Sequence, residues 1–275
     1  HFSPHHDLIS ERLATLYQMM RGEFDIAIVP VTTALYRLAP AAYLAANTFF
    51  FKQGSRLAAA ELRKQLTLAG YTHVTQVVAP GEYSFRGGLI DLFPMGSALP
   101  YRLDLFDEEI ESIRSFDVDT QRSIYKVNEV RLLPAREFPL DETGQTRFRR
   151  NFRERFEGDP SRSRVYKDIS KGVPTAGVEY YLPLFFDSTA IITDYLPQNT
   201  LVCLQGDLMQ AIEQFWTDTH ARHAMLRGDL ANPVLPPNEL FLTADAFFGA
   251  IKPLARIEFE RISPSSSKGE GRDGG

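Results

Sequence analysis

What the sequence lacks narrows the class of protein it encodes. A single cysteine, Cys203, excludes an intramolecular disulfide and a cysteine-rich zinc site, which fits a reducing cytoplasm. No run approaches the roughly 18 consecutive apolar residues of a membrane span, and the first residues show no signal-peptide pattern. The formal charge of −5 argues against nucleic-acid binding through overall basicity. We therefore expect a folded, cytoplasmic protein with Cys203 buried in the apolar run 200–204.

The motifs of common catalytic sites are also missing. No Gly-x-x-x-x-Gly-Lys-Ser/Thr loop is present to hold nucleotide phosphates, and no Gly-x-Ser-x-Gly elbow presents a nucleophilic serine. His220 and His223 have helical spacing, but no thiolate or nearby carboxylate completes a zinc site. The Asp107-Glu108 pair ends an apolar strand as in magnesium-dependent nucleotide hydrolases, yet without a phosphate loop it is better interpreted as a hairpin turn. The sequence predicts no catalytic residue, metal or cofactor, and hence no enzyme.

A strand at residues 101–106 is the clearest positive signal. Because side chains alternate along a strand, one face carries Tyr101, Leu103 and Leu105 and the other carries Arg102, Asp104 and Phe106. The first set suits a protein core. An exposed phenylalanine beside an exposed arginine is typical of a protein-binding hot spot, because it combines a rigid apolar anchor with a fork of donors for carboxylates.

Arg86 is the third residue of this predicted patch. It precedes Gly87 and Gly88, which lack β-carbons and so permit a bulge or the close approach of another backbone. The sequence alone leaves an alternative open, in which Phe106 packs under a loop and Arg102 pairs with Asp104 on a solvated face.

The order of patterns along the chain indicates a mixed α/β protein. Helical spacing of apolar residues over 7–20 is followed by an apolar run at 25–31 that predicts a buried parallel strand. A helix is expected over 55–69, and strands with hairpin-length loops are expected from 72 to about 133. Residues 51–133 therefore form a compact α+β module with an antiparallel sheet, inserted into a surrounding α/β part.

The second half contains an arginine cluster at 146–167, which is the obvious place to look for nucleic-acid contacts. However, Phe148, Phe152 and Phe156 recur every four residues, so we favour an amphipathic helix with the arginines around its solvated side. A strand at 200–204 and a helix at 208–224 follow, and the serine- and glycine-rich residues 263–275 are expected to be a flexible tail.

These residues carry a resemblance to a known family. The runs 2–13, 28–33, 81–94 and 100–122 resemble the N-terminal UvrB-like region of the bacterial transcription-repair coupling factors (Mfd). The run 177–186 resembles that region as well. UvrB shares the pattern Arg-Gly-x-x-x-Asp-x-Phe-Pro at 86–94, whereas the signature at 179–186 resembles the coupling factors only.

The resemblance implies a degenerate helicase-like fold without ATPase function. Residues 1–50 and 134–172 would form an N-terminally truncated domain 1a, residues 51–133 domain 2, and residues 173–262 domain 1b. Domain 2 is the UvrA-binding module of the family, and its UvrA-contacting residues fall on Arg86, Arg102 and Phe106. In the family, other domains form an ATP-dependent translocase that engages RNA polymerase and double-stranded DNA and masks this surface.

The function implied is non-enzymatic recruitment of UvrA in transcription-coupled nucleotide excision repair. Two alternatives stay open on the sequence. The chain could be a UvrB-type module that loads onto damaged DNA, or half of a nucleotide-binding enzyme whose phosphate loop is absent.

Overall fold

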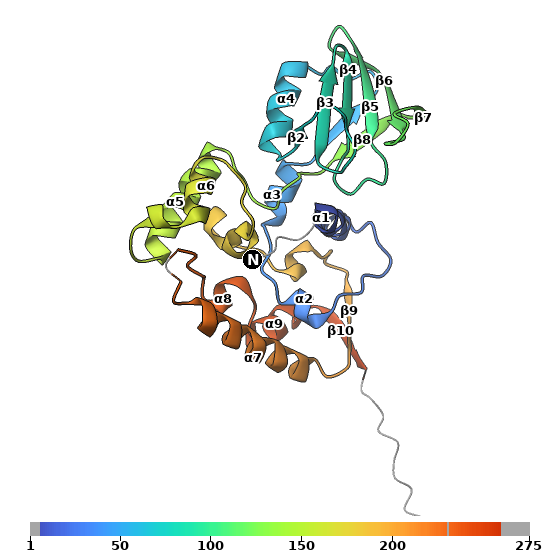
Figure 1. Cartoon of the computed structure of the whole chain (residues 1–275). Coiled ribbons are helices and arrows are strands. Elements are labelled where there is room, and N and C mark those ends of the chain that lie inside the picture. Colours follow the sequence, from blue (N-terminus) through green and yellow to red (C-terminus); the bar gives the residue numbers. More distant parts are fainter. Residues whose placement is uncertain (1–5, 230, 260–275) are drawn as a thin grey trace, which may run out of the picture.

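A six-stranded β-sheet lies at one end of the molecule in the computed structural model, which describes residues 6–229 and 231–259 (Figure 1). Its strand order is β2-β3-β4-β5-β6-β7, and all neighbours are antiparallel except the β2–β3 pair. The strands are β2 (Thr72–His73), β3 (Glu82–Arg86), β4 (Leu89–Leu92), β5 (Tyr101–Phe106), β6 (Glu109–Phe116) and β7 (Ser123–Val127). The predicted antiparallel sheet is confirmed.

One face of this sheet is buried. Ile90, Leu103 and Ile113 from three neighbouring strands are inaccessible to solvent. They share a core with Leu62 and Leu66 of helix α4 (Ala59–Leu68), which packs on this face. The predicted helix thus forms, beginning four residues later than expected.

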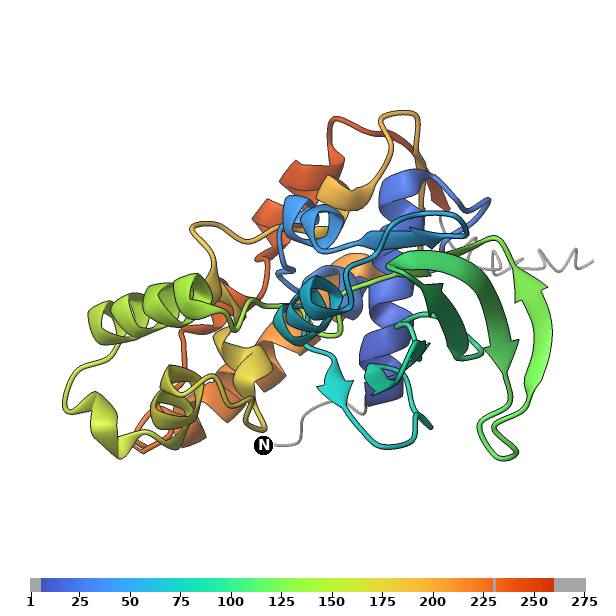
Figure 2. The ribbon, with the colours of Figure 1, turned by 90° about the horizontal axis from the view of Figure 1, so that it is seen from above.

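The chain enters and leaves the region of the sheet at one place. Strand β1 (Phe49–Lys52) comes just before it and strand β8 (Glu129–Leu132) just after it, and the two form an antiparallel pair. Helix α1 (His6–Arg21), predicted from the apolar spacing, runs alongside the sheet (Figure 2) and contributes Leu13, Leu16 and Tyr17 to the same core.

A second core lies among the helices of the middle segment. Helix α5 (Glu142–Arg155) begins where the Asp141 carboxylate accepts a hydrogen bond from Gly144 N at 2.8 Å, and it buries Phe148 and Phe152. The predicted amphipathic helix is confirmed for this part of 146–167. This core also contains residues of α6 (Arg164–Ser170), which follows η1 (Pro160–Arg162), and of η2 (Val178–Phe185). By contrast, α3 (Ala41–Ala46) and η3 (Ile192–Tyr195) contribute Leu44 and Tyr195 to the core of the sheet region, and α2 (Val31–Ala34) contributes Ala34 to a third core.

The C-terminal third of the described chain forms a third core around Leu35, Ile212 and Phe247. Its elements are β9 (Leu201–Gln205), α7 (Leu208–Leu226), α8 (Pro237–Leu240), α9 (Ala244–Ile251) and β10 (Ala255–Phe259). The predicted strand at 200–204 and helix at 208–224 are confirmed. Among the described helices, none combines the length and apolarity needed to cross a membrane.

Two sequence-based expectations are wrong. Residues 25–30 form no strand, because within the described chain no strand pairs with them, and Ile26 and Ile28 stand exposed. Cys203 is exposed rather than buried: β9 pairs with β10 in a two-stranded sheet, and Leu204, not Cys203, packs against the third core. The tail predicted at 263–275 lies outside the described residues.

The two faces of β5 should respond differently to truncation. We expect Leu103→Ala to lower the free energy of unfolding by about 2 to 5 kcal/mol, because it opens a cavity in the core. Phe106→Ala should change it by no more than about 0.5 kcal/mol, because that side chain is exposed. Urea unfolding of both variants measures the difference, and equal losses would contradict the assignment of the faces.

Candidate protein-binding site

The hairpin between β5 and β6 presents Phe106 to solvent. Phe106 pairs with Glu109 across a two-residue turn, and its side chain is 70% exposed. Both turn residues have left-handed backbone angles, with φ of 47° at Asp107 and 66° at Glu108. Such a turn follows the twist of the strands, although it normally selects glycine or asparagine. The alternative in which Phe106 packs under a loop is therefore wrong.

The turn of the neighbouring β3–β4 hairpin contacts strand β5 through a backbone hydrogen bond. Leu105 N donates a hydrogen bond to Gly88 O at 2.8 Å, and a β-carbon at Gly88 would lie 2.8 Å from Leu105 O. Only glycine fits at this approach, as the sequence predicted. The contact holds the turn that follows Arg86 next to the end of β5, which carries Phe106, while β4 lies between β3 and β5.

Asp91 joins the two predicted arginines. It lies on β4 opposite Arg102 of β5, and its side chain is 1% exposed. Its carboxylate accepts hydrogen bonds from Arg102 Nε at 2.6 Å and Nη2 at 2.9 Å, a bidentate pair, and it also accepts one from Arg86 Nη2. One buried carboxylate thus orients two guanidinium groups on the face of the sheet opposite α4.

Arg102 is held on further sides. Its Nη1 donates to Gln121 O at 3.2 Å, and its guanidinium carbon lies 4.7 Å from the centroid of the Phe116 ring. Gln121 itself has a φ of 60°, so its carbonyl is directed at Arg102 by a backbone conformation that a glutamine rarely adopts. The hydrogen bonds to Asp91 raise the pKa of Arg102 above its ordinary value.

The two arginines differ in what they can offer a partner. Arg102 is 14% exposed, and three of its five N–H groups are already donated to Asp91 and Gln121. Arg86 is 48% exposed and makes one described ion pair, so part of its guanidinium remains open to a partner. Arg86 and Phe106 are therefore the accessible residues of the candidate site, whereas Arg102 mainly holds Asp91, the partner that it shares with Arg86.

Sequence reasoning missed the role of Asp91. The alternative pairing of Arg102 with Asp104 is wrong, because Asp104 pairs with Arg114 at 3.1 Å. A signal for Asp91 was available: a two-residue turn at 87–88 brings Asp91 opposite Ser84, on the same face as Arg86. Asp91 is a carboxylate within the apolar run 89–93, and across the hairpin it shares a face with Arg86. This arrangement predicts a buried ion pair between the two side chains.

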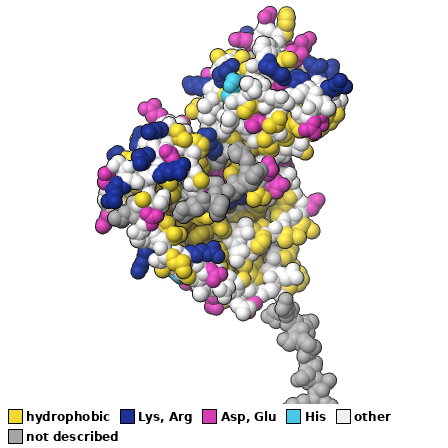
Figure 3. Space-filling view, viewed as in Figure 1, with side chains coloured by type: hydrophobic (Ala, Val, Ile, Leu, Met, Phe, Trp, Pro, Cys, Tyr) yellow, Lys and Arg dark blue, Asp and Glu magenta, His cyan; other side chains and the backbone are white. Residues whose placement is uncertain are grey.

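The other positively charged region lies over α5 and α6, where Figure 3 shows a concentration of lysine and arginine side chains. Several of these arginines pair with carboxylates: Arg147 with Asp187 at 3.4 Å and Arg155 with Glu239 at 3.1 Å. Arg153 lies over the Tyr166 ring. These contacts favour the structural interpretation of the cluster over a continuous nucleic-acid surface.

The described residues also contain no group of three or more histidine, cysteine, aspartate and glutamate side chains that could hold a metal ion. His220 instead packs against Trp216, with ring centroids 5.1 Å apart.

Comparisons with known proteins give a consistent result. The family described as "UvrB interaction domain" matches residues 49–138, which begin at β1 and contain all three predicted site residues. The chain is 45% identical over 260 residues to a transcription-repair-coupling factor of Escherichia coli, covering 94% of this chain. It is 44% identical to that of Haemophilus influenzae, covering 97%, and 30% identical to that of Bacillus subtilis, covering 72%. The chain spans 23% of the length of the first two relatives.

Removing the charge of Asp91 should destabilise the sheet. We expect Asp91→Asn to lower the free energy of unfolding by about 2 to 4 kcal/mol, because it leaves two guanidinium groups facing a neutral amide in a buried position. Asp104→Asn is the matched control: its pair with Arg114 is one-third exposed on both sides and should contribute less than about 1 kcal/mol. Denaturant unfolding distinguishes the two, and equal costs would contradict the central role of Asp91.

The turn that presents Phe106 should gain stability from glycine. Glu108→Gly should raise the free energy of unfolding by about 1 kcal/mol, because glycine adopts the left-handed conformation without steric cost. Lys126→Gly, at an exposed and paired position within β7, should lower it instead. Thermal unfolding of both variants tests this, and a loss of stability in Glu108→Gly would contradict it.

Proposed function

Because the chain corresponds to the UvrB-like N-terminal region of transcription-repair-coupling factors, we propose that it is a non-enzymatic module that recruits UvrA. In this role it links the displacement of a stalled RNA polymerase to nucleotide excision repair. The single observation that supports it best is the exposed Phe106 on the same sheet as the half-exposed Arg86, within the segment that matches the UvrB interaction domain.

The proposed contacts follow from the geometry. Phe106 is the apolar anchor, which a pocket on UvrA would bury. Arg86 donates charge-assisted hydrogen bonds to a carboxylate of the partner, since about half of its side chain is exposed to solvent. Arg102 acts mainly through Asp91, by fixing the direction in which Arg86 points.

The proposed domain layout follows the same family. Residues 51–133 would be domain 2, inserted between the two parts of domain 1a at 1–50 and 134–172, with domain 1b at 173–262. The antiparallel pairing of β1 with β8 supports an insertion at this place. RNA polymerase and double-stranded DNA would bind through parts of the longer relatives that lie outside these 275 residues.

The test is binding of the chain to purified UvrA by titration calorimetry. We expect Phe106→Ala and Arg86→Ala each to weaken binding by about tenfold or more, roughly 1.4 kcal/mol, while leaving the fold intact. Arg102→Ala should weaken binding and also lower the free energy of unfolding, because the buried Asp91 carboxylate loses the two hydrogen bonds that Arg102 donates to it.

Two matched controls come from the same module. Phe50→Ala removes another half-exposed phenylalanine, on β1, and Arg63→Ala removes an arginine that lies over Phe85 on the opposite face of the sheet. Both should bind UvrA like the parent. A folded parent that does not bind UvrA would contradict the proposal. Salt-sensitive binding to damaged duplex DNA would then favour the DNA-loading function.

A further inference from the structure

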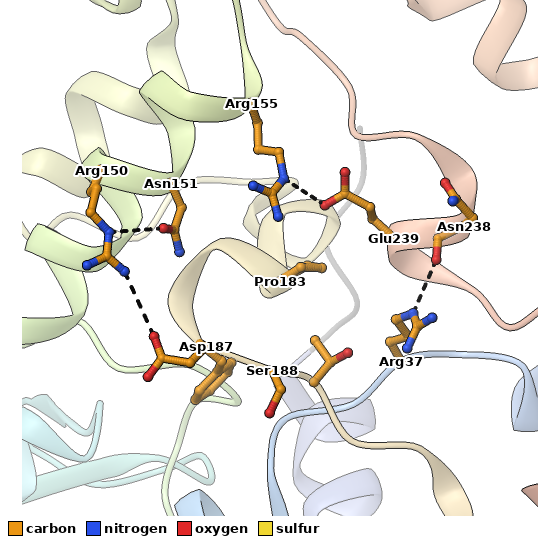
Figure 4. A pocket seen from close by; sticks show the side chains of 11 residues that line it. Arg37, Arg150, Asn151, Arg155, Pro183, Asp187, Ser188, Asn238 and Glu239 are labelled. Carbon is orange, nitrogen blue, oxygen red and sulfur yellow. Dashed lines mark hydrogen bonds and ion pairs between the residues drawn. The ribbon is translucent and has the colours of Figure 1, made fainter.

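A polar cavity lies far from the sheet, among α5, the segment that follows η2, α8 and Arg37 (Figures 1 and 4). Its volume is about 330 Å³, within the range of small-molecule sites. The lining is predominantly polar, and it includes Ser188 and Thr189. None of the residues that line the cavity belongs to the proposed UvrA site or to the family match at 49–138.

Three guanidinium groups, two from α5 and one from a separate segment, line this cavity (Figure 4). Arg150 and Arg155 come from α5 and its end, and Arg37 comes from the segment between α2 and α3. Arg37 Nε donates to the backbone oxygen of Asn238 at 3.2 Å, and this contact leaves its two terminal nitrogens for another acceptor. The guanidinium groups are therefore positioned but only partly engaged.

The two carboxylates of the lining do not balance the arginines. Glu239 contacts Arg155 through one Nε–Oε2 pair at 3.1 Å, and Asp187 approaches Arg150 Nη2 at 3.9 Å. Neither pair is bidentate, and three arginines against two carboxylates leave the cavity with a formal charge of +1. An anion that satisfied more of these donors would compete with Asp187 and Glu239 for them.

We propose that this cavity binds the phosphoryl groups of a small ligand. A guanidinium group pairs with either a carboxylate or a phosphate, but donors that approach from three sides suit a tetrahedral oxyanion better than a planar one. The cavity is larger than a single phosphate ion, so the ligand carries at least two phosphoryl groups or a phosphate on a small organic body. Ser188 and Thr189 add hydroxyl donors to the site.

Inorganic pyrophosphate is the first probe, added to the whole chain in titration calorimetry at constant ionic strength. We expect saturable binding with a stoichiometry of one, weakened about tenfold by Arg37→Ala and by Arg155→Ala. Arg153→Ala is the matched control, because this arginine of α5 lies over the Tyr166 ring and does not line the cavity. Its binding should equal that of the parent.

A gain-of-affinity variant keeps the test independent of folding losses. Glu239→Gln removes the internal competitor for Arg155 and should tighten pyrophosphate binding several-fold. A nucleoside diphosphate in place of pyrophosphate shows whether the organic body contributes, and citrate tests a carboxylate ligand. No saturable binding, equal weakening in Arg153→Ala, or binding of citrate as tight as that of pyrophosphate would each overturn the proposal.

Discussion

The surface that distinguishes this protein depends on one buried carboxylate. Asp91 lies in a strand between apolar neighbours, and an ion in that position is stable only if donors surround it. Arg102 and Arg86 provide them from the strands on either side. The same contacts that satisfy Asp91 fix the two guanidinium groups, so the stability of the sheet and the shape of the proposed binding surface have one cause.

The sheet is therefore built differently on its two faces. The face against α4 is held by apolar contact among residues such as Leu103 and Ile113, which tolerates many arrangements of similar volume. The opposite face combines a small apolar cluster of Val77, Phe93 and Phe116 with directional hydrogen bonds from two arginines to Asp91. Directional contacts permit fewer arrangements, which suits the proposed surface because it must present two side chains in one geometry.

Local rules predicted what depends on neighbouring residues in the chain. Alternation along β5 identified the exposed Phe106, and the glycine pair correctly indicated a close backbone approach at Gly88. The failures concern partners remote in sequence. Cys203 lies in an apolar run, as buried residues often do, but its exposure depends on which elements cover β9. The role of Asp91 could be predicted only from the register of β3, β4 and β5. That register follows only once the lengths of the two connections between these strands are known.

The antiparallel pair of β1 and β8 brings together the two points at which the chain joins the sheet region. A segment whose ends are adjacent needs only one small attachment site on its host, and replacing or removing it alters little else in the host's backbone. Such a segment can pass between genes as a single piece. This geometry gives a physical route by which a different host domain could acquire the same sheet without redesign of its own core.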